Sequence, residues 1–196
     1  MGSMDYESAV IEFLAQKENA GLVFDIVDRA EQVKDKLLLK FWRALETKAR
    51  DKLGGPTGWT TSLRPERDLL KAKEYGGFYI RPSLQPSRYV YIQMLQDDGF
   101  RLEYGIAWNA ETKKPPELEE INGLREMLKG MGYETGRWSE WWLGIKRTPW
   151  VLREKQPCVR ISGDDSLEEE LATSLVELFK AVKKPLEQAN QALAII

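Results

Sequence analysis

Two runs of alternating apolar and polar residues flank a short turn segment in the middle of the chain. Residues 89–95 form the first run, residues 100–108 form the second, and Asp97-Asp98-Gly99 lies between them. Alternation with period two is typical of a strand, and Asp-Gly between two such runs is a strong hairpin signal. The sequence therefore predicts two antiparallel neighbouring strands. In the second strand the even-numbered apolar residues share one face, which we expect to lie against helices.

Further strands and helices are predicted on either side of this hairpin. Short apolar runs predict strands at residues 58–63 (at the sheet edge), 77–81, 138–146 and 159–161. Apolar residues at steps of three and four predict helices at residues 5–16, 22–53, after Pro115-Pro116 as far as Gly132, and after Ser166. On the long helix, Phe41 and Trp42 fall in the apolar register and are assigned to the core. Ser166 and Glu169 predict a capping box, and Pro185 either kinks or ends the last helix.

These elements indicate an α+β fold, with an antiparallel sheet of about four or five strands packed by long N- and C-terminal helices. A chain of 196 residues is of ordinary size for one domain. We expect a single domain over residues 4–196, with residues 1–3 as an expression scar and residues 185–196 as a flexible or contact tail. No apolar run is long enough to span a bilayer and no secretory signal is evident, so the prediction is a cytoplasmic protein that does not bind membranes.

The residue types that are missing exclude several chemistries. The chain contains no histidine, which removes the commonest general base, the commonest metal ligand and every His-dependent triad. Its one cysteine, Cys158, has no histidine to activate it, and we assign it to a buried position. No glycine-rich phosphate-binding fingerprint is present. We therefore expect no cofactor, no metal and no catalytic residue.

With histidine absent and Cys158 assigned to a buried position, the remaining catalytic groups are carboxylates. They leave one enzymatic alternative, a metal-dependent nuclease. Such a site needs an Asp and a Glu-x-Lys element that converge at strand ends. Glu46-Thr47-Lys48 falls in the middle of a predicted helix and Glu111-Thr112-Lys113 in a predicted loop, and neither has a partner Asp one strand earlier. Asp97 and Asp98 are interpreted as turn residues.

Two groups of residues are candidates for contact with a nucleic acid or a protein partner. The polar face of the long helix carries a surplus of basic residues, among them Lys40 and Arg43. The second group combines tryptophans with cations: Arg137, Trp138, Trp141, Trp142, Lys146 and Arg147. If residues 138–146 form one strand, Trp138 and Trp142 share a face and Trp141 lies with Leu143 and Ile145 on the other. A solvated helix face and a core position for the tryptophans are the alternatives, and exposed tryptophan beside cations would suit a nucleic-acid strand or a protein hot spot.

The segments 41–46 (FWRALE), 104–108 (YGIAW) and 139–144 (SEWWLG), followed by the acidic-capped last helix, resemble the C-terminal region of PD-(D/E)XK nuclease-like bacterial proteins. The resemblance covers residues 25–183. It implies a bacterial or phage origin and an association with DNA processing or defence. In that family the nuclease core would precede this region, and it is absent here, so no catalytic residue is carried over.

The sequence thus predicts a non-catalytic binding or accessory module, whose partner is nucleic acid or protein. Two alternatives stay open. One is a divergent metal-dependent nuclease of the PD-(D/E)XK type. The other is a homo-oligomeric protein-interaction domain, such as a homodimer, that uses the apolar tail and the tryptophans.

Overall fold

The computed structural model describes residues 3–55, 58–71, 76–109, 116–136, 140–163 and 166–195, with side chains from residue 8 onward. The chain divides into two compact units, Met1–Leu37 and Leu38–Ile196. The first unit contains helix α1 (Ser3–Ala15) and the start of helix α2 (Ala20–Leu53). The second contains the rest of α2 and all of the sheet. Both helices are confirmed close to their predicted bounds.

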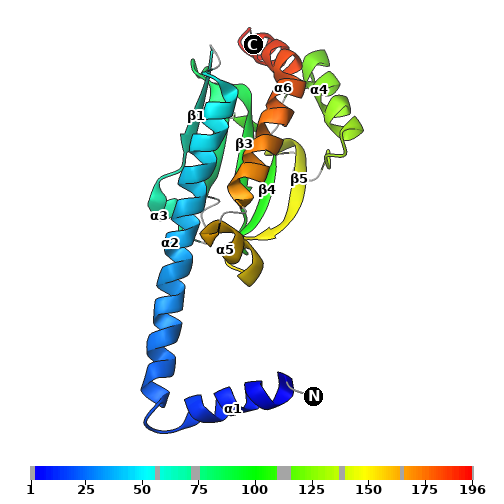
Figure 1. Ribbon diagram of the computed structural model, residues 1–196. Helices are drawn as coiled ribbons and strands as arrows, with labels where there is room; N and C mark the ends of the chain where they lie inside the picture. The colour runs from blue at the N-terminus through cyan, green and yellow to red at the C-terminus, as the bar shows by residue number, and fades with distance from the viewer. Residues whose placement is uncertain are drawn as a thin grey trace. The chain divides into compact units, whose positions relative to one another are not determined.

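The second unit is built on a five-stranded antiparallel sheet, and its fold is α+β as predicted. The strands are β1 (Trp59–Leu63), β2 (Gly77–Pro82), β3 (Tyr89–Gln96), β4 (Arg101–Asn109) and β5 (Trp142–Val151). Their order in the sheet follows their order in the chain, and every pair is antiparallel (Figure 1). The predicted hairpin is β3–β4, with Met94 opposite Tyr104. The strand predicted at the sheet edge, residues 58–63, is confirmed as the edge strand β1.

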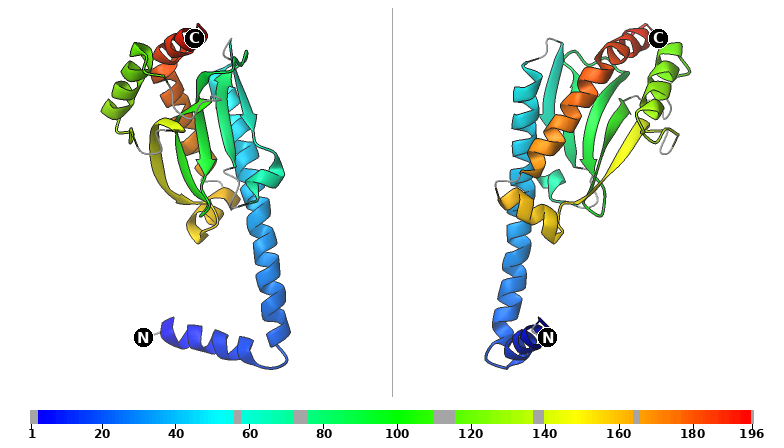
Figure 2. Two further views of the ribbon diagram at one scale, coloured as in Figure 1. Left: turned by 180° about the vertical axis from the view of Figure 1, so that it is seen from behind. Right: turned by 45° about the vertical axis from the view of Figure 1, so that its right-hand side comes forward.

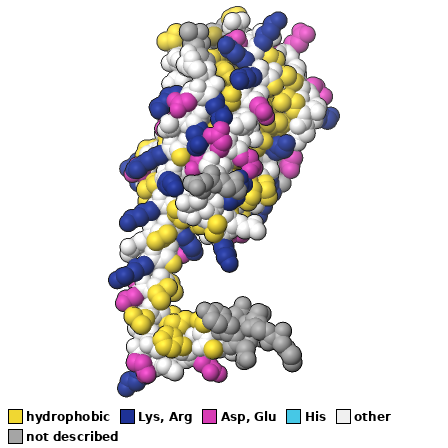
Figure 3. Space-filling model, viewed as in Figure 1, with side chains coloured by type: hydrophobic (Ala, Val, Ile, Leu, Met, Phe, Trp, Pro, Cys, Tyr) yellow, Lys and Arg dark blue, Asp and Glu magenta, His cyan; other side chains and the backbone are white. Residues whose placement is uncertain are grey.

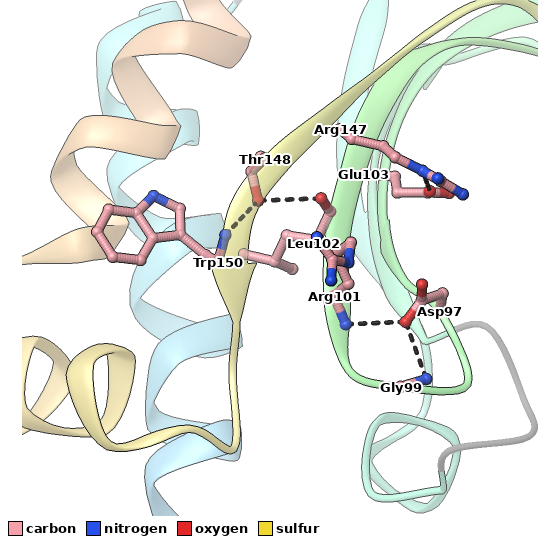
Figure 4. Close-up of polar contacts among 8 residues, drawn as sticks. All are labelled: Asp97, Gly99, Arg101, Leu102, Glu103, Arg147, Thr148 and Trp150. Carbon is pink, nitrogen blue, oxygen red and sulfur yellow. Dashed lines mark hydrogen bonds and ion pairs between the residues drawn. The ribbon is translucent and has the colours of Figure 1, made fainter.

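The β3–β4 turn is held by the side chain of Asp97 (Figure 4). Its Oδ1 accepts hydrogen bonds from the backbone N–H groups of Gly99 and Arg101, both at 2.9 Å. This local capping is the usual role of Asp in a turn, and it confirms the structural interpretation of Asp97. The residue in the left-handed region is Phe100 (φ 62°), whereas Gly99 has no positive φ.

Helices cover one face of the sheet. Helix α6 (Leu167–Leu193) and the second half of α2 lie across this face, and α4 (Glu119–Gly130) packs beside α6 and β5 (Figures 1 and 2). Phe41 and Trp42 of α2 are fully buried, as predicted. The rings of Trp59 and Phe179 meet edge to face with centroids 5.3 Å apart, which ties β1 to α6.

Two side-chain amides, one buried and one half-buried, connect the helices to the sheet. Gln96 is completely buried at the end of β3, where its Oε1 accepts a hydrogen bond from Trp42 Nε1 at 3.1 Å. Its Nε2 donates to the carbonyl oxygen of Leu69, in the short helix α3 (Glu66–Leu69), at 2.6 Å. On α6, the amide of Asn190 pairs with both the N–H and the C=O of Val90. Each amide therefore satisfies backbone or indole groups that would otherwise be buried without partners.

Two predicted strands differ from the structure. The predicted strand 138–146 is shifted, because β5 begins at Trp142 and continues through Pro149 to Val151. β5 is the last strand of the sheet, and an edge strand tolerates a proline that cannot donate a hydrogen bond. The predicted strand 159–161 is wrong: these residues belong to helix α5 (Lys155–Ser162). Pro157 lies in the first turn of this helix, where its missing N–H has no intrahelical partner to lose.

Helix α6 begins at the predicted place but by a different mechanism. Ser166 is its N-cap residue, yet its side chain makes no capping hydrogen bond. The carboxylate of Glu169 turns instead to α2, where Lys48 and Lys52 bind it at 3.0 and 2.6 Å. The helix also passes through Pro185 and ends at Leu193, so the proline does not end it.

Candidate interaction surfaces

Only one of the two described tryptophans of the predicted site lies at the surface of the protein. Trp141 is 58% exposed in the turn before β5, whereas Trp142 is 6% exposed and packs in an apolar cluster with Leu95, Ala107 and Ile145. The register between β4 and β5 shifts at this point, so that Ile106 pairs with Gly144 but Ala107 pairs with Trp142. This bulge places Trp142 in the cluster with Ile145, which an unbroken alternation forbids. The predicted grouping of Trp141 with Leu143 and Ile145 is therefore wrong.

Two of the cations predicted beside these tryptophans, Arg147 and Lys146, already have partners in the chain. Arg147 Nε donates to Glu103 Oε1 at 2.6 Å, and the Glu103 side chain is 9% exposed (Figure 4). Lys146 Nζ lies 5.7 Å from the centre of the Tyr133 ring, a cation–π distance. Arg137 and Trp138 lie outside the described residues.

The basic face of α2 is also occupied by contacts within the chain. Arg43 forms an ion pair with Glu66, and Lys48 and Lys52 share Glu169. Lys40 Nζ donates to the carbonyl oxygen of Ile161 at 2.8 Å. The two lysines hold the pKa of the Glu169 carboxyl below its ordinary value, Lys52 contributing most. These pairs favour a structural role for the basic residues of α2 over binding to the phosphates of a nucleic acid.

A surface not identified from the sequence lies on the sheet face opposite the helices, which no described helix covers (Figure 2, left). Tyr79, Tyr89 and Tyr91 stand together there, with ring centroids 5.8 and 5.5 Å from that of Tyr91. Arg64 donates a hydrogen bond to the hydroxyl of Tyr79 and lies over its ring. Burial raises the pKa of Tyr79 and of Tyr91 above the ordinary tyrosine value.

Exposure decides what this tyrosine surface can do. Tyr79 is 8% exposed and Tyr89 is 5% exposed, so neighbouring side chains already cover most of each ring. A base-stacking platform needs free aromatic faces. The tyrosines therefore act as packing residues on this side of the sheet, and they offer a nucleic-acid base little area.

The largest concentration of exposed apolar residues is in the first unit. Thirteen large hydrophobic side chains are exposed across the described residues, and eight of them precede residue 38. We call these eight the N-terminal apolar surface: Val10, Ile11, Phe13, Leu22, Phe24, Ile26, Val27 and Val33. Figure 3 shows hydrophobic side chains gathered over these helices. The other five, Leu84, Met131, Trp141, Val159 and Ile195, come from five separate segments of the second unit.

The C-terminal tail has one buried and one exposed apolar residue. Leu193 is 2% exposed and packs back on the domain, whereas Ile195 is 86% exposed. Ile195 lines an open groove of about 700 Å³ between α4 and α6, together with Leu124 and Pro185. The tail is therefore anchored at Leu193.

Reactive groups do not gather in the part of the chain that the structure describes. No three Cys, Asp or Glu side chains lie there in a position to hold a metal ion. Glu46 and Lys48 of the first Glu-x-Lys segment lie within α2, and residues 111–113 of the second are outside the described ranges. Cys158 is half-buried in α5, with its Sγ 3.4 Å from the carbonyl oxygen of Leu152. Within the same residues, no helix is both long and apolar enough to cross a membrane.

Comparison of the chain with protein-family models, with curated proteins and with solved structures gives no match. The class that the fold defines is an α+β protein with a five-stranded antiparallel meander and helices on one face.

Proposed function

We propose that this protein is a non-catalytic binding module that recognises a protein partner through the N-terminal apolar surface. The observation that carries the proposal is the exposure of eight large hydrophobic side chains within residues 10–33. Folded monomers expose such residues singly, and a concentration of eight within residues 10–33 is typical of an interaction site.

The free energy gained by burying these side chains is large enough to support an interface with a partner. Fully burying one Leu, Ile, Val or Phe side chain contributes about 1.5–3 kcal/mol. Burying four or five of the eight therefore gives roughly 6–15 kcal/mol, comparable with the estimated ~4–15 kcal/mol of freedom lost on association. A partner that covers about half of this surface offsets that cost, and covering more of it gives measurable affinity.

The context suggested by the resemblance is retained within this proposal. An accessory module in a bacterial or phage DNA-processing or defence protein would need a docking face, and the N-terminal apolar surface supplies one. The nuclease alternative has no support among the described carboxylates. Cleavage of DNA that depends on magnesium or manganese would reverse this judgement.

Nucleic-acid binding is the second candidate, favoured by one exposed residue, Trp141. A gel-shift titration at low salt tests it, because phosphate contacts are strongest there. Binding that Trp141→Ala weakens would support this candidate. Absence of any retardation of single- or double-stranded DNA or RNA would remove it.

Affinity capture from cell extract of the source, with matched variants, tests the protein-partner proposal. Ile26→Asp and Val33→Asp, seven residues apart on one side of α2, each place a charge on the N-terminal apolar surface, and Leu84→Asp does the same at an exposed apolar residue of the second unit. We expect proteins retained by the wild type to be lost with the first two variants and kept with the third. Equal retention by all three variants would refute the proposal.

A further inference from the structure

We infer that the sheet face without helices binds a phosphate group at Arg81, with Arg64 as the second positive charge. The site goes beyond the proposed function, because it lies on β1–β3 and involves no residue of the N-terminal apolar surface. It takes a phosphate that is either free or carried on a larger ligand.

The guanidinium of Arg81 has a buried donor without an acceptor. Arg81 is a half-buried residue of β2, and its Nε is buried with no hydrogen-bond partner among the described residues. Its Nη1 donates one long hydrogen bond, of 3.4 Å, to Gln85 Oε1. A buried polar group costs free energy unless a partner satisfies it. An oxyanion suits a guanidinium, because it accepts two of the N–H groups at once.

The strand register places a hydroxyl group on each side of Arg81. Thr60 of β1 is its partner in the β1–β2 ladder. The β2–β3 register pairs Ile80 with Ile92, and its continuation puts Tyr91 opposite Arg81. Residues directly opposite one another point to the same face, with Cβ atoms about 4.5–5.5 Å apart. Thr60, Arg81 and Tyr91 therefore form a row across the face that no described helix covers (Figure 2, left).

A second guanidinium adds positive charge to the same part of the face. Arg64 follows β1 directly, and it reaches the hydroxyl and the ring of Tyr79, two residues before Arg81 on β2. Burial raises the pKa of Tyr79 and of Tyr91, and the charges of both arginines oppose this rise at both hydroxyl groups. The two guanidiniums therefore act on one small area of the sheet.

Carboxylates do not neutralise these two charges among the described residues. Asp68, whose charge acts on Arg64, is bound by Arg67 Nε at 3.1 Å. Glu103 of β4 is bound by Arg147 at 2.6 Å. A phosphate monoester carries a charge of about −1.5 to −2 at pH 7, which matches two guanidiniums, whereas a carboxylate matches only one.

The covered tyrosine rings leave this site open to a small anion. Thr60 and Arg64 are exposed, and Arg81 and Tyr91 are half-buried. A phosphate needs donor groups at the rim of the tyrosine surface, whereas a stacked base would need the ring faces.

NMR of the whole chain at constant ionic strength tests the site at the atom that defines it. Inorganic phosphate is the probe, and the Nε–H signal of Arg81 is the readout. We expect this signal to shift to saturation with phosphate and to respond little to acetate. Absence of a saturable shift, or an equal response to acetate, overturns the inference.

Matched variants separate a built site from general attraction, with the backbone signal of Thr60 as the readout. Arg81→Lys keeps the charge but lacks the Nε–H, and it should weaken phosphate binding at least tenfold. Arg64→Gln should weaken it about tenfold, as expected for the loss of a charge-assisted hydrogen bond. Arg125→Gln removes the same charge from α4 and should leave the affinity unchanged. Unchanged affinity in Arg81→Lys, or an equal loss in Arg125→Gln, overturns the site.

Three ligands distinguish the source of the phosphate: inorganic phosphate, a short peptide with one phosphoserine, and adenosine monophosphate. Tighter binding of the peptide assigns the site to a phosphorylated protein segment, tighter binding of the nucleotide assigns it to a nucleotide, and equal binding assigns it to the free ion. Failure of all three to bind overturns the inference. None of these results depends on Ile26 or Val33, so the proposed function is tested separately.

Discussion

Two phenylalanines of α2 provide a matched test of where the core ends. Phe24 is 73% exposed, whereas Phe41 is fully buried and its ring meets that of Trp42 edge to face, with centroids 5.1 Å apart. Phe41→Ala should cost about 3–5 kcal/mol of unfolding free energy, the usual result of emptying an aromatic site in a core. Phe24→Ala should change this free energy by less than about 0.5 kcal/mol, as for most surface substitutions.

Urea denaturation in dilute solution, followed by far-UV circular dichroism, measures both values. With a slope of about 2 kcal/mol per molar urea, Phe41→Ala should lower the midpoint by roughly 1.5–2.5 M and Phe24→Ala should barely move it. A loss above about 2 kcal/mol for Phe24→Ala in dilute solution would refute the reasoning, since it would mean that Phe24 is already buried in the isolated chain.

Three further predictions concern the second unit. Gln96→Leu leaves Trp42 Nε1 and the Leu69 carbonyl without partners and should lower the unfolding free energy, measured by urea denaturation, by about 2–4 kcal/mol. Gln93→Leu loses one long contact of 3.4 Å to Tyr91 and should lower it by less. Equal losses for the two variants would contradict this account. The lowered pKa of Glu169 means that its stabilising effect is present above the ordinary glutamate pKa and is lost as the pH falls through the lowered value; an NMR titration should show a midpoint below that of a free glutamate, and Lys48→Met with Lys52→Met should raise it. Tyr79 and Tyr91 have raised pKa values because they are buried, so the folded state should lose stability as the pH rises above the ordinary tyrosine value near 10. Phenolate absorbance should show tyrosines that ionise at a higher pH than in the urea-unfolded chain. Ionisation of all seven tyrosines at the same pH would contradict this prediction.

The parts of the fold that sequence reasoning predicted are those with a strong local signal. Alternation around Asp97-Asp98-Gly99 defined the β3–β4 hairpin, because the period and the turn chemistry agree there. The long periodic stretch before Gly54 similarly defined α2. At these places the local preference and the tertiary structure require the same conformation.

The errors lie where a tertiary contact overrides the local signal. The bulge opposite Ala107 reverses the face of Trp142, and a sequence does not show where a register shifts. Residues 159–161 read as a strand because they alternate, but Pro157 can start a helix as readily as it interrupts a strand. Glu169 was predicted to cap its own helix and instead binds two lysines of α2.

The candidate surface was missed for a related reason. The apolar residues from Val23 to Leu37 were recognised in the sequence as one side of a helix. Periodicity identifies an apolar face, but it does not reveal what covers that face. Only the exposure of Phe24, Ile26 and Val33 distinguishes this half of α2 from the half that carries Phe41 and Trp42.

Hydrogen exchange along the chain, measured alone and in complex with a protein that the wild type captures, tests the central claim most directly. The account predicts that slower exchange in the complex is confined to α1 and to residues 20–37, and that β1–β5 exchange at the same rate in both. Slower exchange in the sheet, or no change in the N-terminal helices, would contradict it.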